Sequence, residues 1–120
     1  MRVLIADNQP QVRRALRVLL EQDSQVQIAG EASSVRGLLL QMKSTAPDLV
    51  LLGGNLPAMA LDELLPALRR ANPKLRVIVL STQPELGPAA LAAGADGFLS
   101  KTEPSERLIK AIQDMKREKR

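Results

Sequence analysis

Polar side chains follow three of five short apolar runs in this chain, and a glycine ends another. Asp7 and Asn8 follow the first run, Ser81 the fourth and Lys101 the fifth, whereas Gly53 ends the third. If these residues come together, they form one polar pocket with a carboxylate, an amide, a hydroxyl and an ammonium group. Glycine has no side-chain oxygen, so the third run contributes no nucleophile.

Strand and helix signals alternate along the chain. Apolar runs predict strands, and apolar residues at helical spacing between them predict helices. Cap residues predict helix starts at Asn8, with Gln11 three positions on, at Ser33 or Ser34, and at Thr102. The expected strands are 2–6, 26–32, 49–52, 76–80 and 97–100.

Two helices are expected to be irregular. Pro66 lies inside the apolar pattern of the third helix and predicts a late start or a kink. The segment around Pro84 and Pro88 predicts a short fourth helix, near 89–93, that ends at Gly94.

This alternation predicts an α/β fold. Five strand–helix units with right-handed crossovers give a five-stranded parallel sheet with helices on both faces. For a chain of 120 residues, the flavodoxin-like doubly wound order 2-1-3-4-5 is favoured, with a site where the strands end. The polar residues and Gly53 then lie along one edge of the sheet.

Composition limits the possible functions. A length of 120 residues predicts one domain, 1–120, and its core must be aliphatic because Phe98 is the only aromatic residue. Without cysteine or histidine there is no disulfide, no thiolate and no imidazole base. No apolar stretch approaches the roughly 20 residues of a membrane span, and no signal peptide is apparent, so a cytoplasmic location is expected.

The net charge of +4 comes mostly from residues 116–120, of which four are basic and one is acidic. A basic helix end is favourable on its own, through the helix dipole. It could also lead into a missing output domain. With the rest of the chain near neutral, contact with nucleic acid is expected only through such a domain.

At this point the chain resembles a response-regulator receiver domain of two-component (phosphorelay) signalling, with the CheY-like form of the predicted fold. The lysine followed by Thr102 resembles the receivers of LuxR-type transcription regulators. The matching segments are 3–8, 47–52, 55–57, 77–81 and 93–101.

The resemblance implies a role for each site residue. In the family, an aspartate that ends strand 3 accepts a phosphoryl group, and Gly53 stands at that position. Asp7 and Asn8 stand at the acidic pair that helps to hold Mg²⁺. Ser81 stands at the residue that senses the phosphoryl oxygen, and Lys101 at the lysine that pairs with it.

Two further positions carry over. Phe98 stands at the aromatic residue whose rotamer reports activation. Asn55 stands at the residue whose main-chain carbonyl ligates the metal.

Two departures from the family decide the expected chemistry. Gly53 cannot form an acyl phosphate, and Asn8 is neutral where a carboxylate is usual, so Mg²⁺ binding is expected to be weak or absent. Asp7 and Lys101 then balance each other in charge. We expect them to pair directly or through water and to lock the site in one metal-free state.

Simpler interpretations stand beside these. Ser81 could be a strand-end hydroxyl bonded to backbone, Lys101 a solvated surface lysine, and Phe98 half-exposed packing. Gly53 and Gly54 could form a backbone nest for an anion, or a closely packed turn.

The leading hypothesis is therefore a pseudo-receiver, a regulatory protein-interaction module that works without aspartyl phosphorylation and is not an enzyme. Its partners would bind the face of helix 4, strand 5 and helix 5, with a homodimer as one possibility, and it could be the regulatory part of a transcription factor. The alternative is a regulator that binds a small anion in the vacated acidic pocket.

Overall fold

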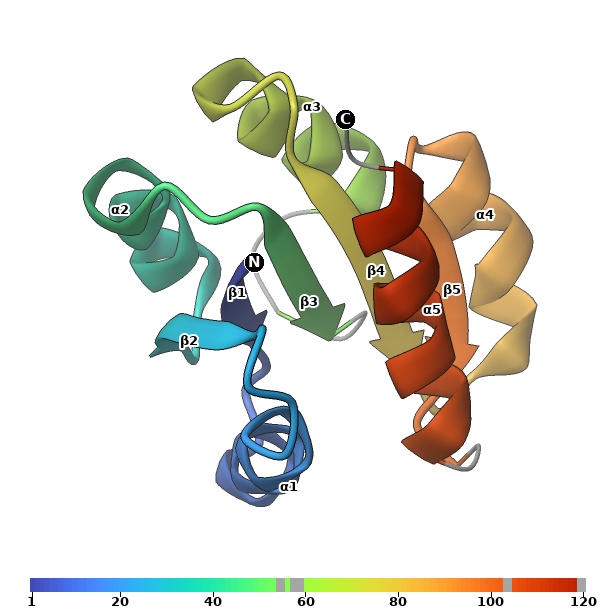
Figure 1. Cartoon of the computed structure of the whole chain (residues 1–120). Helices are drawn as coiled ribbons and strands as arrows, with labels where there is room; N and C mark the ends of the chain where they lie inside the picture. The colour runs from blue at the N-terminus through green and yellow to red at the C-terminus, as the bar shows by residue number, and fades with distance from the viewer. Residues whose placement is uncertain (54–55, 57–59, 103–104, 119–120) are drawn as a thin grey trace.

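The computed structural model describes residues 1–53, 56, 60–102 and 105–118. The described residues alternate between strands and helices from end to end, as the sequence predicts (Figure 1). The strands are β1 (Arg2–Ala6), β2 (Gln27–Ala32), β3 (Leu49–Gly53), β4 (Arg76–Ser81) and β5 (Gly97–Ser100). The helices are α1 (Pro10–Leu20), α2 (Val35–Thr45), α3 (Leu61–Ala71), the 3-10 turn η1 (Pro84–Leu86), α4 (Gly87–Ala92) and α5 (Ser105–Glu118).

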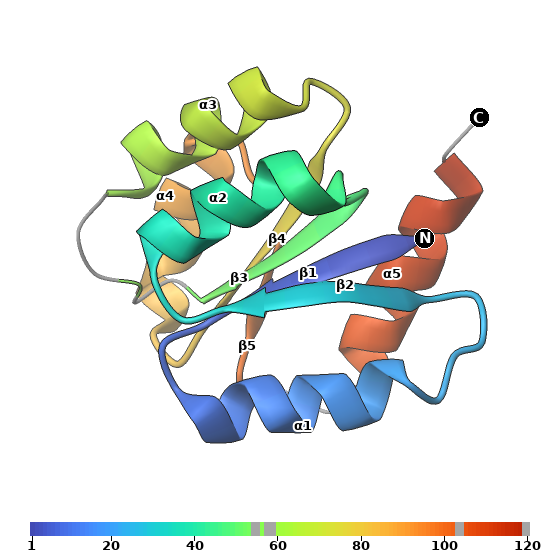
Figure 2. The ribbon, with the colours of Figure 1, turned by 90° about the vertical axis from the view of Figure 1, so that its left-hand side faces the viewer.

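The five strands form a parallel sheet in the order β2-β1-β3-β4-β5, which confirms the predicted flavodoxin-like, CheY-like topology. Helices cover both faces of the sheet. Figure 2 shows α2, α3 and α4 above the sheet and α1 and α5 on the opposite side. Because every strand pair is parallel, all five carboxyl ends lie at one edge of the sheet.

Two aliphatic layers hold the helices on the sheet. Side chains alternate between the two faces along each strand. In β1, Leu4 packs toward α2 and α3, whereas Val3 and Ile5 pack toward α1 and α5. The central strand β3 is buried throughout, as expected for a strand covered on both faces. The core is aliphatic as predicted, with Phe98 packed at its margin.

The predicted start of α1 is wrong in detail. Gln9, not Asn8, is the N-cap residue, and it makes no side-chain capping bond. The carboxylate of Asp7 accepts the hydrogen bond from the Gln9 N–H at 2.9 Å, and this local turn over residues 7–9 precedes the helix. For α2, the Ser34 hydroxyl accepts from the Gly37 N–H at 3.1 Å, which confirms that residue as the cap. The segment between Thr102 and α5 lies outside the described residues.

The two irregular helices differ from expectation at their starts. Helix α3 begins at Leu61 and runs through Pro66, so the predicted late start is wrong. Helix α4 is short, as predicted, but begins at Gly87 after the turn η1. Gly94 follows it with φ +111°, a left-handed conformation that glycine adopts readily. Within the described residues, no helix is long and apolar enough to span a membrane.

Strand β2 is an edge strand and is irregular. Its register with β1 shifts between Val3, which pairs with Ile28, and Leu4, which pairs with Gly30. Ala29 is therefore an extra residue in a β-bulge. Farther along, the side chain of Gln41 in α2 donates from Nε2 to the main-chain carbonyl of Glu31 at 2.5 Å.

Candidate functional site

The sheet register brings the predicted site residues to one edge. Ala6 pairs with Leu52, so the next residues along the two strands, Asp7 and Gly53, are neighbours. On the other side, Gly53 pairs with Leu80 at the end of β4. We call the set formed by Asp7, Asn8, Gly53, Ser81 and Lys101 the strand-end site.

Asp7 and Lys101 form a direct ion pair, as predicted. Asp7 is only 1% exposed, and Lys101 Nζ lies 2.7 Å from its Oδ2. The pair is not aligned as a hydrogen bond, and no described residue donates one to Oδ2. The Lys101 side chain is 11% exposed, so the interpretation as a solvated surface lysine is wrong. A buried carboxylate without this cation would be strongly destabilising.

The other site residues make more ordinary contacts. Ser81 is buried, and its hydroxyl accepts from the Gln83 N–H at 3.0 Å, in agreement with the simpler interpretation of a hydroxyl bonded to backbone. Asn8 is exposed. Gly53 is buried as the last residue of β3, and its carbonyl accepts from the Leu56 N–H at 3.3 Å.

The remaining predicted positions contribute less. Asn55 and Gly54 lie outside the described residues. Phe98 is partly buried in β5 and packs against the core, as the simpler interpretation predicts. Its ring lies against the start of α4, where a Cβ on Gly87 would come within 3.1 Å of Phe98 Cδ2. Glycine at position 87 thus lets α4 lie close to the ring.

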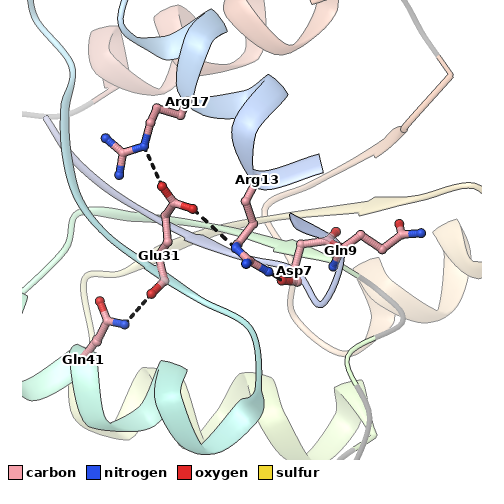
Figure 3. A network of polar contacts seen from close by, with 6 residues as sticks. All are labelled: Asp7, Gln9, Arg13, Arg17, Glu31 and Gln41. Atoms are coloured by element: carbon pink, nitrogen blue, oxygen red, sulfur yellow. Dashed lines mark hydrogen bonds and ion pairs between the residues drawn. The ribbon is translucent and has the colours of Figure 1, made fainter. Parts of the chain in front are cut away.

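The sequence analysis missed a second cation beside Asp7. Arg13, in the first turn of α1, donates from Nη1 to the main-chain carbonyl of Asp7 at 2.7 Å (Figure 3). Glu31 in β2 lies between Arg13 and Arg17 and contacts both, with its Oε1 3.4 Å from Arg13 Nε. Only the arginine spacing of four along α1 could have suggested a shared partner.

A comparable ion pair lies at the other end of the fold. Lys116 of α5 donates from Nζ to Asp23 Oδ2 at 3.0 Å, and the Gln25 N–H donates to Asp23 Oδ1 at 2.9 Å. The Gln25 N–H bond and, next, the Lys116 ammonium hold the pKa of Asp23 below its ordinary value. Both groups favour the charged carboxylate.

The fold and the strand-end site together define a class. An α/β sheet of order 2-1-3-4-5, with Asp7 after β1, a hydroxyl after β4 and a lysine after β5, has the layout of a phosphorelay receiver. The family model of the response regulator receiver domain matches residues 3–113. The chain therefore belongs to the receiver-domain family of two-component response regulators.

Individual relatives are of the LuxR and NarL type. The nitrate/nitrite response regulator NarL of Escherichia coli K12 is 34% identical over 112 residues, which cover 92% of this chain and 52% of that protein. The DNA-binding transcriptional activator DevR/DosR of Mycobacterium tuberculosis is 32% identical over 117 residues, which cover 96% of this chain and 54% of that protein. This chain thus spans about half the length of the curated relatives that it matches.

Solved structures agree. The receiver domain of a NarL response regulator from Mycobacterium tuberculosis superimposes with a TM-score of 0.84 at 30% identity, covering 95% of this chain and 94% of that chain. RcsB from Salmonella enterica serovar Typhimurium, solved on the rprA promoter with the phosphomimetic BeF3⁻, gives a TM-score of 0.88 at 25% identity. That match covers 98% of this chain and 60% of that chain.

Proposed function

We propose that this chain is a pseudo-receiver, a non-enzymatic regulatory module that controls a partner without aspartyl phosphorylation. The observation that carries the proposal is which residues are present at the strand-end site. Its one carboxylate is buried against Lys101, and glycine ends the strand from which an acceptor aspartate would project. Without an oxygen at position 53, no acyl phosphate can form there.

The contacts of Asp7 also argue against a Mg²⁺ site. Mg²⁺ dehydrates reluctantly and binds through carboxylates and phosphate oxygens. Here Oδ1 of Asp7 accepts from the Gln9 N–H, and Oδ2 is covered by Lys101. The described residues contain no group of three or more acidic, histidine or cysteine side chains that could hold a metal ion. The residues present do not fit the metal that the family uses.

The small-anion alternative has less support. Lys101, the cation that would attract an anion, is already neutralised at 2.7 Å by Asp7. The Ser81 hydroxyl already accepts a backbone hydrogen bond. An anion would also approach a buried carboxylate, which repels it.

A partner would bind the face formed by α4, β5 and α5, and a homodimer through this face is one form of the proposal. Helix α4 supplies apolar contact area there, because Leu91 is 52% exposed and Pro88, Ala89 and Ala92 are also exposed. The segment 86–95 contains no charged residue. RcsB has been solved on a promoter; for this chain, DNA would be reached only through an output domain and not through this module.

The decisive experiment is treatment with acetyl phosphate, read by intact mass. The parent is compared with two double variants, Asn8→Asp with Gly53→Asp and Asn8→Asp with Gly53→Asn. The second is the matched control because asparagine has the size of aspartate but cannot accept a phosphoryl group. We expect no adduct on the parent or on the control, and a labile adduct on the Gly53→Asp variant. A labile phosphoryl adduct on the parent would overturn the proposal.

A metal titration tests the other half of the proposal. Millimolar Mg²⁺ is expected to leave the amide resonances of Asp7, Asn8 and Gly53 unchanged. Specific shifts at these three residues would show that the site binds the metal after all.

A further inference from the structure

The side chain of Arg13 lies against the β1–α1 loop and does not extend into solvent. Its side chain is only 19% exposed, and its Nη1 lies 2.7 Å from the main-chain carbonyl oxygen of Asp7. A hydrogen bond from a charged donor is roughly twice as strong as a neutral one. The helix thus reaches back from its first turn to hold the loop that precedes it.

Glu31 fixes the direction of that arginine. It lies on β2 beside Ile5 of β1, so its position is set by the sheet. One carboxylate oxygen faces Arg13 and the other contacts Arg17 Nε at 2.5 Å. Figure 3 shows Glu31 between the two arginines, with Arg13 directed at Asp7. A rigid guanidinium can contact a carboxylate and a carbonyl at once, which a lysine ammonium does less well.

Lys101 and Arg13 contact different parts of Asp7. Lys101 covers the carboxylate from β5, and Arg13 holds the carbonyl from α1. The Asp7 N–H donates to the Ala32 carbonyl at 3.0 Å, and Oδ1 accepts from Gln9. The N–H, the carbonyl and Oδ1 of Asp7 therefore each have a hydrogen-bond partner, whereas Oδ2 is matched only by the Lys101 ammonium, in an ion pair. Lys101 neutralises the Asp7 carboxylate, and the charge of Arg13 is balanced by Glu31.

We propose that Arg13, oriented by Glu31, is the positioning residue that fixes the β1–α1 loop in place of a metal ion. The inference rests on the proposed function, since it assumes a site that works without metal.

The test is hydrogen exchange of the Gln9 amide, which is bonded to Asp7 Oδ1 and reports on the loop. Arg13→Gln is compared with Arg14→Gln, the adjacent exposed arginine of the same helix. We expect exchange at Gln9 to be about tenfold faster in Arg13→Gln and unchanged in Arg14→Gln. The amides of β3 serve as an internal reference and should be unchanged in both variants, which separates a local effect from global destabilisation.

A second pair of variants separates positioning from general packing. If Glu31 acts through Arg13, Glu31→Gln accelerates exchange at Gln9 by about threefold, and adding it to Arg13→Gln has no further effect. The milder Arg13→Lys keeps the charge and should fall between the parent and Arg13→Gln. Unchanged exchange in Arg13→Gln, an equal effect of Arg14→Gln, or additive effects of the two substitutions would each overturn the inference. None of these outcomes bears on acetyl-phosphate labelling, so the two proposals fail separately.

Discussion

The β1–α1 loop and the α1–β2 loop, at opposite ends of α1, hold an aspartate with the same two contacts. In each loop, one carboxylate oxygen accepts the N–H two residues on, at 2.9 Å for both Asp7 and Asp23. The other oxygen faces a lysine from the last third of the chain, Lys101 at 2.7 Å or Lys116 at 3.0 Å. Asp7 and Asp23 therefore have nearly the same pair of backbone and lysine contacts.

Burial separates the two loops. The side chains of Asp7 and Lys101 are 1% and 11% exposed, whereas those of Asp23 and Lys116 are 30% and 21% exposed. Water screens the outer pair, and a screened pair contributes little. The inner pair is shielded, so each partner depends on the other. The same two contacts are therefore required for stability at Asp7, whereas they contribute little to stability at Asp23.

The largest expected effect is that of Lys101→Met. Methionine keeps the length of the side chain but leaves the Asp7 carboxylate buried without a cation, so the free energy of unfolding should fall by about 3–5 kcal/mol. Urea unfolding followed by circular dichroism measures it. Adding Asp7→Asn removes the unpaired charge and should restore much of the loss. A loss of less than about 1 kcal/mol in the free energy of unfolding would mean that the Asp7–Lys101 pair contributes no more than an exposed ion pair.

The matching substitution at the outer pair should have a much smaller effect. Lys116→Met is expected to lower the free energy of unfolding by about 0.5 kcal/mol or less, because solvent already screens the pair. In 1 M NaCl, where the Debye length is about 3 Å, the difference from the parent should nearly vanish. The Lys101→Met deficit should persist in the same salt. Equal salt sensitivity of the two variants would contradict the contrast.

The smallest effect concerns the titration of Asp23. Its pKa is held below the ordinary 3.8, first by the Gln25 N–H and then by Lys116. Lys116→Met should therefore raise this pKa only part of the way to 3.8, as measured by NMR of the carboxyl carbon. A complete return to 3.8 would mean that the lysine, and not the backbone, dominates.

The lowered pKa of Asp23 also fixes a pH dependence. The unfolded chain binds the proton more readily than the folded chain does. The stabilisation is therefore complete above the unfolded value near 3.8, and it is lost as the pH falls through the lower folded value. Asp23→Asn should remove this part of the acid dependence, so the variant should be slightly less stable than the parent near neutral pH and the difference should shrink as the pH falls below the folded pKa.

The fold was predictable because its signals are local and repeated. Apolar runs and helical spacing placed every strand within one residue of its observed ends. Topology predicted that Asp7 and Lys101 lie at one edge of the sheet, and their pairing followed from the charge balance left by Gly53 and Asn8 in the family's site. Within the site, the prediction failed at Asn8. Propensity favours Asn8 as a cap residue, but it does not show that Asp7 bonds the Gln9 N–H and that Gln9 becomes the residue before the helix.

Other contacts depend on geometry that the sequence does not display. Arg13 meets Glu31 only because α1 packs along β2, and both side chains reach across that packing. Lys116 and Asp23 are 93 residues apart and meet because α5 ends beside the α1–β2 loop. Their residue types are common on any surface. No sequence pattern distinguishes such pairs from solvated charges.

The irregular β2 has a consequence for self-association. An open strand edge normally invites another strand to add to the sheet, which leads to fibrils or swapped dimers. Here the bulge at Ala29 interrupts the regular spacing of backbone N–H and C=O groups along β2. The Gln41 side-chain amide already donates a hydrogen bond to the Glu31 carbonyl. Gly30 leaves the space that the Gln41 side chain fills. Addition of a regular strand along the whole of β2 is therefore disfavoured.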